Sequence, residues 1–205
     1  AMSLRGDGYV VHDVDRSDNG QDDFSGFTGR LVPQAEVNWR YPLAKPTEYG
    51  RLYVEPVANF IVSPKGNNPN EIPNEDSQDV EFSDENLFSA NHFLGHDRVE
   101  SGPRTNYGVR GGLHSRDIGE IHAMFGQSYR AQRDSNFSTK SGLNDHFSDY
   151  VGQVGYRYEE MVTAAYHFRI DKDSNTLPKN EINMQFNVQP LSFSGNYLSL
   201  DDANE

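Results

Sequence analysis

The sequence predicts an all-β protein, a segment of an antiparallel up-and-down transmembrane β-barrel with about nine strands. Three observations predict this fold. Segments that alternate between apolar and polar residues follow one another along most of the 205 residues. The connections between them alternate between long polar loops and tight turns, as periplasmic turns and extracellular loops do in outer-membrane barrels. Aromatic residues make up 12% of the chain, which favours strands over helices.

Three strands are predicted in the first third of the chain. The earliest alternates weakly because Gly6 and Gly8 interrupt it, whereas the second alternates without a break. Residues 15–27 are rich in Gly, Asp, Asn and Ser and are expected to form a loop, and residues 42–50 are expected to form a Pro-containing link. The predicted strands are residues 3–14, 31–41 and 51–62.

Six further strands are predicted after a long loop. The turns between them are short at residues 114–119, 159–160 and 189–190, and the intervening loops at 130–149 and 171–180 are longer and polar. The last strand loses its alternation toward a polar tail at the end of the sequence. The predicted strands are residues 104–113, 120–129, 150–158, 162–170, 181–188 and 191–200. We expect all strands to belong to one partial barrel domain spanning residues 1–205.

The long loop, residues 64–103, is the most unusual segment. It is far longer than a typical connection of about 4–6 residues, and it is rich in Asn, Asp and Glu. It also contains apolar residues, which a simple tether would not need: Ile72, Phe82, Leu87, Phe88, Phe93 and Leu94. We therefore expect a packed loop that acts as a lid or plug, with a motif formed by Pro73, Asn74, Glu75, Asp76 and Ser77.

Charged residues avoid the apolar faces of the predicted strands. No Asp, Glu, Lys or Arg falls on those faces, and lipid would explain this, since Lys or Arg at the bilayer midplane costs about 2–4 kcal/mol. A soluble sheet with one face on a core alternates in the same way, so the rhythm of the loops is what favours lipid. The polar faces would then line the lumen of the barrel, with these candidate residues: Glu36, Arg40, Glu55, Arg110, Arg157 and Arg169.

Two further features leave alternatives open. Pro33 and Pro56 fall inside predicted strands, where each removes a ladder hydrogen bond, so they indicate edge or bulge positions or a weakened seam. Several aromatic residues fall near strand ends, where they fit either an interfacial girdle or the ordinary strand preference of Tyr. These residues are Trp39, Tyr41, Tyr129, Tyr150, Tyr156, Tyr158 and Tyr197.

Composition argues against several functional classes. A net charge of −13 opposes a nucleic-acid partner, and the absence of cysteine rules out disulfides and thiolate metal sites. No run of 18 apolar residues indicates a transmembrane helix. The sequence has no nucleophile elbow, Walker loop or HExxH motif, so neither an enzyme nor a cofactor is predicted.

Metal binding is not predicted either. His92 and His96 have i,i+4 spacing, but Gly95 between them and the lack of a helical pattern indicate a loop. An acidic cluster in the long loop lacks the spacing of an EF-hand, so we interpret it as a solvated surface, with cation bridging to a phosphorylated surface as the alternative. The cluster comprises Glu71, Glu75, Asp76, Asp79, Glu81, Asp84 and Glu85.

The chain resembles the barrel domain of the LptD family, the lipopolysaccharide-assembly or organic solvent tolerance proteins of Gram-negative bacteria, and most of all alphaproteobacterial members. The resemblance rests on the long-loop motif PNEDSQD followed by F-x-D-x-NLF, and on shorter segments elsewhere. Those segments are LRGDGY, GRLVPQAEVNWRYPL, GQSYR, SGLNDHFSDYVG, YHFRIDKD and YLSLDD, so that the resemblance covers the whole chain.

The resemblance implies a large barrel in the cell outer membrane that inserts lipopolysaccharide into the outer leaflet through a weakly paired seam. It implies two partners, an LptE-like lipoprotein plug and a periplasmic lipopolysaccharide bridge. This chain departs from the family pattern because it lacks the periplasmic jelly-roll, the full number of strands and the cysteines of some members. It is best interpreted as part of the barrel. The alternatives are a passive diffusion porin and a soluble acidic β-sandwich that binds a glycan or Ca²⁺.

Overall fold

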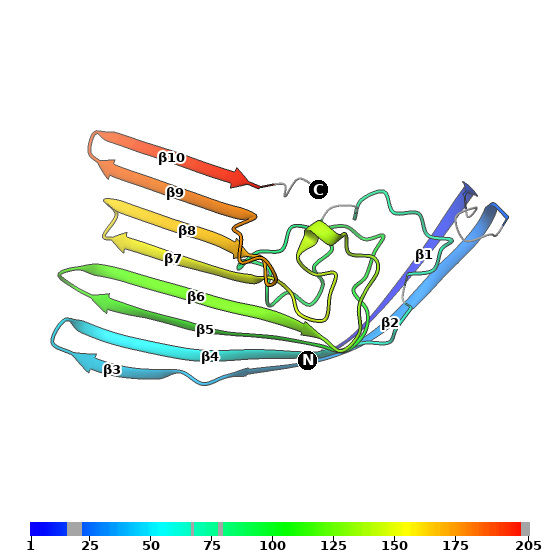
Figure 1. The fold of residues 1–205 in the computed structure, drawn as a ribbon, viewed down its shortest axis with the longest axis horizontal. Helices are drawn as coiled ribbons and strands as arrows, with labels where there is room; N and C mark the ends of the chain where they lie inside the picture. The colour runs from blue at the N-terminus through cyan, green and yellow to red at the C-terminus, as the bar shows by residue number, and fades with distance from the viewer. Residues whose placement is uncertain (16–21, 67, 78–79, 202–205) are drawn as a thin grey trace.

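The computed structural model describes residues 1–15, 22–66, 68–77 and 80–201, and these residues form one antiparallel sheet of ten strands (Figure 1). The order in the sheet is β1-β2-β4-β5-β6-β7-β8-β9-β10, with β3 also paired to β4. The strands are β1 (Met2–Val14), β2 (Phe24–Arg40), β3 (Leu43–Thr47), β4 (Gly50–Val62), β5 (Arg104–Ser115), β6 (Gly119–Arg130), β7 (Tyr150–Tyr158), β8 (Val162–Ile170), β9 (Lys179–Val188) and β10 (Leu191–Leu200). One 3-10 turn, η2, covers Thr139–Ser141. No helix in the described part of the chain is long and apolar enough to cross a membrane.

The predicted up-and-down antiparallel architecture is confirmed. Apart from β3, every strand pairs with its neighbours in sequence, and the tight turns gather at one end of the sheet while the long connections gather at the other (Figure 1). The sheet is open, with β1 and β10 at its two edges among the described residues. It is therefore a segment of wall rather than a closed barrel.

The prediction of about nine strands is one short. Residues 43–47, expected to be part of a link, form β3, which pairs with β4 from Leu43↔Val54 to Thr47↔Gly50. Pro46 concealed this strand, but β3 pairs on one side only, and an edge strand tolerates proline. The expected loop at 15–27 is also too long, because β2 begins at Phe24; residues 16–21 lie outside the described residues.

The two prolines inside strands occupy places where the ladder is already interrupted. The pairing of β2 with β4 begins at Ala35, and Pro33 lies two residues before it, where β2 pairs with β1 alone. Pro56 lies opposite the junction of β2 and β3, where its carbonyl accepts a hydrogen bond from the Tyr41 amide at 3.1 Å. Both positions agree with the edge alternative, because at each proline the strand is paired without interruption on only one of its two sides.

The register divides the sheet into two faces. Pairs such as Glu55↔Arg110 and Glu120↔Arg157 place the charged positions of successive strands on one face, as predicted. The other face carries large apolar side chains that remain exposed: Trp39 is 50% exposed and Phe193 61%. We call these the polar face and the apolar face. The buried core lies against the polar face, beneath the long loops.

Candidate functional site

The long loop, residues 63–103, lies across the polar face from one side of the sheet to the other. Near the first edge, Arg30 of β2 donates a hydrogen bond to the carbonyl of Asp97 at 2.7 Å. Near the other edge, Lys179 of β9 forms an ion pair with Glu81. Three further contacts lie between these two points. Asn59 of β4 donates a hydrogen bond to the Phe88 carbonyl, the Arg110 guanidinium of β5 lies over the Phe88 ring, and His167 of β8 is hydrogen-bonded to Asp84.

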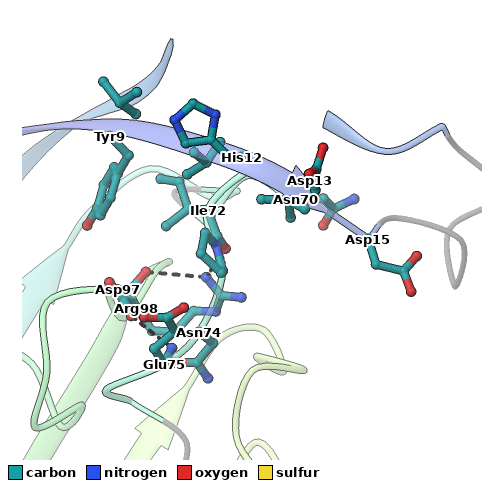
Figure 2. A pocket seen from close by; sticks show the side chains of 14 residues that line it. Tyr9, His12, Asp13, Asp15, Asn70, Ile72, Asn74, Glu75, Asp97 and Arg98 are labelled. Carbon is teal, nitrogen blue, oxygen red and sulfur yellow. Dashed lines mark hydrogen bonds between the residues drawn. The ribbon is translucent and has the colours of Figure 1, made fainter. Parts of the chain in front are cut away.

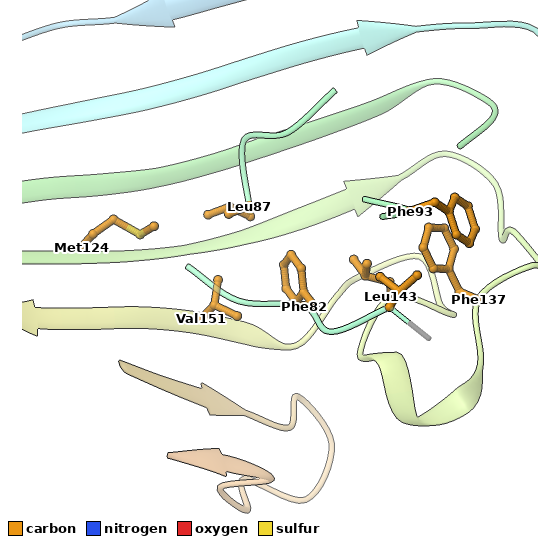
Figure 3. Close-up of a cluster of buried hydrophobic side chains, with 8 residues drawn as sticks. Phe82, Leu87, Phe93, Met124, Phe137, Leu143 and Val151 are labelled. Atoms are coloured by element: carbon orange, nitrogen blue, oxygen red, sulfur yellow. The ribbon is translucent and has the colours of Figure 1, made fainter. Parts of the chain in front are cut away.

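An apolar cluster fixes the middle of the loop to the sheet (Figure 3). The side chains of Phe82 and Leu87 are fully buried, and they pack toward Met124 of β6 and Val151 of β7. Gly126 makes room for this contact, because a Cβ at that position would lie 2.5 Å from Leu87 Cδ2. Burying a side chain of this size contributes about 1.5–3 kcal/mol, so the loop is packed rather than solvated.

The second long connection, residues 131–149, completes the same cluster. The rings of Phe93 and Phe137 stack with their centroids 4.5 Å apart, which joins the two loops. The guanidinium of Arg130 lies over the Phe137 ring, 4.3 Å from its centroid, while Leu143 is fully buried in the cluster. The two loops therefore form one cover over the β6–β7 part of the polar face.

A buried charged cluster holds the end of the long loop. Glu100 is 1% exposed, and it forms ion pairs with Arg104 at the start of β5 and with Arg130 at the end of β6. His92 Nδ1 lies 2.6 Å from Glu100 Oε2, which also accepts the His92 backbone amide at 3.1 Å. A guanidinium of Arg104 also donates to the carbonyl of Ala90.

The electrostatics of this cluster favour an ionised glutamate. Burial by itself would raise the pKa of Glu100, but the charges of His92, Arg130 and Arg104 outweigh burial and hold the pKa well below its usual range. The carboxylate therefore carries its charge at neutral pH. Without it, two arginines would be left buried with no counter-charge, a situation that costs several kcal/mol.

The predicted motif, residues 73–77, forms a reciprocal clasp with the return arm of the loop. The Asp76 carboxylate accepts the backbone amides of His96 at 2.8 Å and Asp97 at 3.0 Å. In return, the Asp97 carboxylate accepts the amides of Glu75 at 2.9 Å and Asp76 at 3.2 Å. Asn74 closes a local turn by accepting the amide of Ser77 at 3.1 Å.

The geometry of the clasp explains why Asp76 and Gly95 occupy their positions. Backbone amide bonds from His96 and Asp97 hold the pKa of Asp76 well below its usual range, because they stabilise the charged form. Gly95 allows the two arms to approach, since a Cβ there would lie 2.1 Å from Asp76 Oδ1. We therefore interpret the motif as a structural element that joins residues 73–77 to residues 95–97.

The family model described as LptD, LPS transport system D, matches residues 1–205. The chain belongs to the LptD family. The resemblance read from the loop motif is confirmed, and a search of curated proteins finds no match. At the level that family membership supports, the chain is a component of lipopolysaccharide transport and assembly. LptD proteins form a transport family of the Gram-negative outer membrane rather than an enzyme family.

Three of the predicted lumen residues of this LptD chain lie together on β2 and β4. Arg40 Nε lies 2.8 Å from Glu55 Oε1, and the Glu55 side chain is largely buried by this neighbourhood. Glu36 accepts hydrogen bonds from Asn38 and Asn59, each at 2.8 Å. The Glu36 group and the Arg40–Glu55 pair are two separate hydrogen-bonded groups on the polar face of neighbouring strands.

The other three predicted lumen residues are dispersed. Arg110 is an exposed residue whose guanidinium lies over Phe88 of the loop, with 5.1 Å between the guanidinium carbon and the ring centroid. Arg169 lies 3.5 Å from Asp149 and donates to the carbonyls of Lys140 and Ser141, so it supports the second loop. Arg157 is exposed on β7 opposite Glu120. Their role in a lumen stays a prediction.

Two cavities flank the cover formed by the loops. One, of about 730 Å³, lies between β1 and the clasp region, with Tyr9, Ile72 and Arg98 among its lining residues (Figure 2). The other, of about 1200 Å³, lies between the second loop and the β8–β9 connection and is lined by Arg169 and Lys172 among others. The cover is therefore packed at its centre and less tightly filled at both sides.

The histidine pair does not form a joint site. His92 is buried against Glu100, whereas His96 is exposed and contributes its carbonyl to the β1–β2 side. The acidic residues of the loop separate in the same way: Glu81 and Asp84 pair with the sheet, and Asp76 clasps backbone amides. Asp79 lies outside the described residues. Within the described chain, no group of three or more His, Asp and Glu side chains is placed to hold a metal ion.

The sequence analysis missed the arginines that anchor the loop. Arg30, Arg104 and Arg130 are all nearly buried and all bind atoms of residues 63–103 or their neighbours. Arg104 and Arg130 each stand at the loop end of a predicted strand, beside a loop rich in carboxylates. This placement of arginines at the strand ends beside an acidic loop is the sequence feature that could have predicted the anchoring ion pairs.

Proposed function

We propose that this chain forms part of the wall of an outer-membrane β-barrel that moves lipopolysaccharide to the outer leaflet. The observation that carries this proposal is the inverted polarity of the sheet: large side chains such as Phe60 and Phe193 are exposed on one face, while the charged face is the one covered by loops. An exposed apolar face of this kind is matched to lipid. Membership of the LptD family supports lipopolysaccharide as the molecule that is moved.

In this proposal residues 1–205 act as one domain whose polar face contributes to the lumen. Glu36 is hydrogen-bonded to Asn59 and Arg40 is paired with Glu55, and Arg110, Arg157 and Arg169 add positive charge on the same face. Such a surface suits the hydrophilic saccharide of the cargo, because hydroxyl and phosphate groups find both donors and acceptors there. The apolar face holds the wall in the bilayer.

The long loop would act as a lid. Residues 63–103 cover the polar face and are anchored by Glu100, by the apolar cluster and by contacts with β8 and β9. Passage of a large saccharide through the covered region then requires this loop to move. An LptE-like lipoprotein plug and a periplasmic lipopolysaccharide bridge are the partners that the family relationship suggests.

The proposal is tested by circular dichroism of the purified chain in buffer and in detergent micelles, combined with partitioning into vesicles. Strand signal that appears only with detergent or lipid supports a wall whose apolar face meets lipid. Cooperative folding in plain buffer, as a soluble β-sandwich would show, contradicts it.

The cargo is tested separately. Depletion of the intact protein in cells should reduce the amount of lipopolysaccharide at the cell surface, and restoring it should reverse the defect. Ion conductance by the purified protein, without any lipopolysaccharide defect on depletion, would instead support a diffusion porin.

A further inference from the structure

The hairpin of β1 and β2 leaves the rest of the sheet. β2 pairs with β4 only between Ala35 and Arg40, whereas its pairing with β1 runs from Ala35 to Phe24. The greater part of the hairpin therefore extends beyond its neighbour β4, as Figure 1 shows. On its β2 side this part has no strand beside it within the described residues, and contacts with the long loop position it there.

The hairpin has little stiffness of its own. Gly8 pairs directly with Gly29, and Gly6 and Gly26 stand in the same ladder. Glycine brings no side chain for cross-strand packing and has more backbone freedom to lose on folding. A two-stranded ribbon of this composition is marginal without tertiary support.

That support comes from Arg30, whose side chain is only 3% exposed. Within the hairpin its Nε lies 2.7 Å from Asp7 Oδ2, and its Nη2 donates to the Tyr9 hydroxyl at 3.2 Å. Toward the loop it donates to the Asp97 carbonyl at 2.7 Å, to Asn68 Oδ1 at 3.0 Å and to the His96 carbonyl. A guanidinium can serve both sides because its donors form a rigid planar fork.

The loop corner that receives Arg30 is shaped by the clasp. The carbonyls of His96 and Asp97 face the hairpin, where Arg5 and Tyr9 also donate to the His96 carbonyl, at 2.9 and 3.1 Å. The amides of the same two residues point to the carboxylate of Asp76. Asp76 thereby fixes the peptide orientation that Arg30 binds.

The polar contacts between hairpin and loop are concentrated near this corner, with one more from Gln34, whose side-chain amide donates to the Ala90 carbonyl at 3.1 Å. Farther along β1 a cavity of about 730 Å³ lies between the strand and the loop, with His12 and Asp13 of β1 and Ile72 and Glu75 of the loop among its lining residues (Figure 2). Arg30 and its neighbours Arg5 and Tyr9 are therefore the principal joint between the two elements.

We propose that Arg30 couples the β1–β2 hairpin to residues 63–103, so that hairpin and loop move on the sheet as one unit. The motif at residues 73–77 serves this coupling by building the His96–Asp97 corner. The inference rests on the proposed role of the loop as a lid, and adds that the lid opens only together with the hairpin at the edge of the wall.

The coupling is tested by distance measurements between spin labels in the intact protein in detergent micelles. Residues 1–205 contain no cysteine, and any cysteine elsewhere in the intact protein is replaced by serine, so that labels at two introduced cysteines are unique. Val10→Cys reports on the hairpin and Leu94→Cys on the loop, both at highly exposed positions, and each is paired with Arg116→Cys in the β5–β6 turn. The unsubstituted background is expected to give narrow distance distributions for both pairs.

Arg30→Met is expected to broaden the Val10 distribution at least twofold in width and the Leu94 distribution less, because Glu100 and the apolar cluster still hold the loop on the sheet. Asp76→Asn should broaden the Val10 distribution as well, although Asp76 bonds to the corner rather than to the hairpin, and this variant carries the test if Arg30→Met does not fold. Arg110→Met is the matched control, because it removes a loop contact at Phe88 and should leave the Val10 distribution unchanged.

Two results would overturn the coupling. One is a Val10 distribution that stays narrow in Arg30→Met, and the other is a Val10 distribution that broadens equally in the control Arg110→Met. The lid proposal has its own readout, since it requires the Leu94 distribution to change when lipopolysaccharide is added. A loop that responds to lipopolysaccharide while the hairpin stays narrow would therefore remove the coupling and leave the lid in place.

Discussion

The two faces of the sheet have opposite relations between polarity and burial. On the apolar face, Trp39, Phe60 and Phe193 are between 46% and 61% exposed although nothing in their chemistry favours water. On the polar face, Glu100, Arg104 and Arg130 are between 1% and 3% exposed although all three are charged. A soluble sheet shows the reverse arrangement, with its apolar face on the core.

The difference separates two sources of stability. On the apolar face, rings of neighbouring strands stack on one another, as Phe125 does with Tyr150 and Phe168, but no other layer of the described chain covers them. The contribution of this face to stability therefore depends mainly on the medium around it. The polar face gains its stability from residues 63–103 and 131–149, which bring their own apolar cluster and neutralise the strand arginines. Variants on the two faces should therefore change different quantities: loop opening on the polar face and stability in lipid on the apolar face. Four predictions, in decreasing order of expected effect, distinguish the two faces.

Removal of the buried carboxylate should have the largest effect. Glu100→Ala leaves Arg104 and Arg130 buried without a counter-charge, which is expected to cost about 3–5 kcal/mol in the opening free energy of the long loop. Hydrogen exchange of the backbone amides in residues 63–103 measures this cost. Glu120→Ala, half-exposed opposite Arg157, is the control and should change it by at most about 1 kcal/mol. Equal effects for the two variants would contradict a buried anchor.

A cavity beneath the loop should have the next largest effect. Leu87→Ala empties a fully buried position against Met124 and should cost about 2–5 kcal/mol, because the surroundings relax only partly. Leu94→Ala makes the same chemical change in the same loop at a side chain that is 80% exposed, and should stay within about 0.5 kcal/mol. Rates of limited proteolysis within the loop compare the two. Similar rates would mean that the loop is not packed as described.

A charge on the apolar face should be costly only in a bilayer. Val109→Arg, on β5 and 48% exposed, is expected to lose about 2–4 kcal/mol of folding free energy in lipid vesicles, measured by urea titration. Thr163→Arg, on the polar face of β8, is the matched control and should be nearly neutral. If both arginines are tolerated equally, the apolar face does not meet lipid.

Acid should release the loop only at low pH. The pKa values of Glu100 and Asp76 are both held below their usual range, so their contributions are fully present above about pH 5 and are lost as the pH falls through the lowered values. A spin label at Leu94 should keep the same mobility from pH 7 to pH 5 and gain mobility only below about pH 4. A transition between pH 6 and 7 would contradict this account, because neither carboxylate titrates there.

The strands could be predicted from sequence because alternation is a local property. β4 through β10 were found within a few residues of their bounds, and the separation of charged from apolar positions followed from the same period of two. β3 was missed because Pro46 is a strand breaker in general, and only the pairing shows that β3 lies at an edge.

The contacts of the loop could not be predicted in the same way. Arg30 and His96 are 66 residues apart, and Asp84 and His167 are 83 residues apart, so no local pattern connects them. The sequence indicates a solvated acidic surface, but in the structure Glu81 pairs with Lys179 and Asp84 pairs with His167, both on distant strands. The apolar residues of the loop did indicate packing, although not its location.

The central claim, that the apolar face meets lipid, is tested most directly with the single tryptophan of the chain. Trp39 lies on that face and is 50% exposed. In vesicles containing brominated lipids its fluorescence should be strongly quenched, while acrylamide in the water should quench it weakly. Strong quenching by acrylamide with no effect of the brominated lipids would contradict the account, because the apolar face would then be in contact with water.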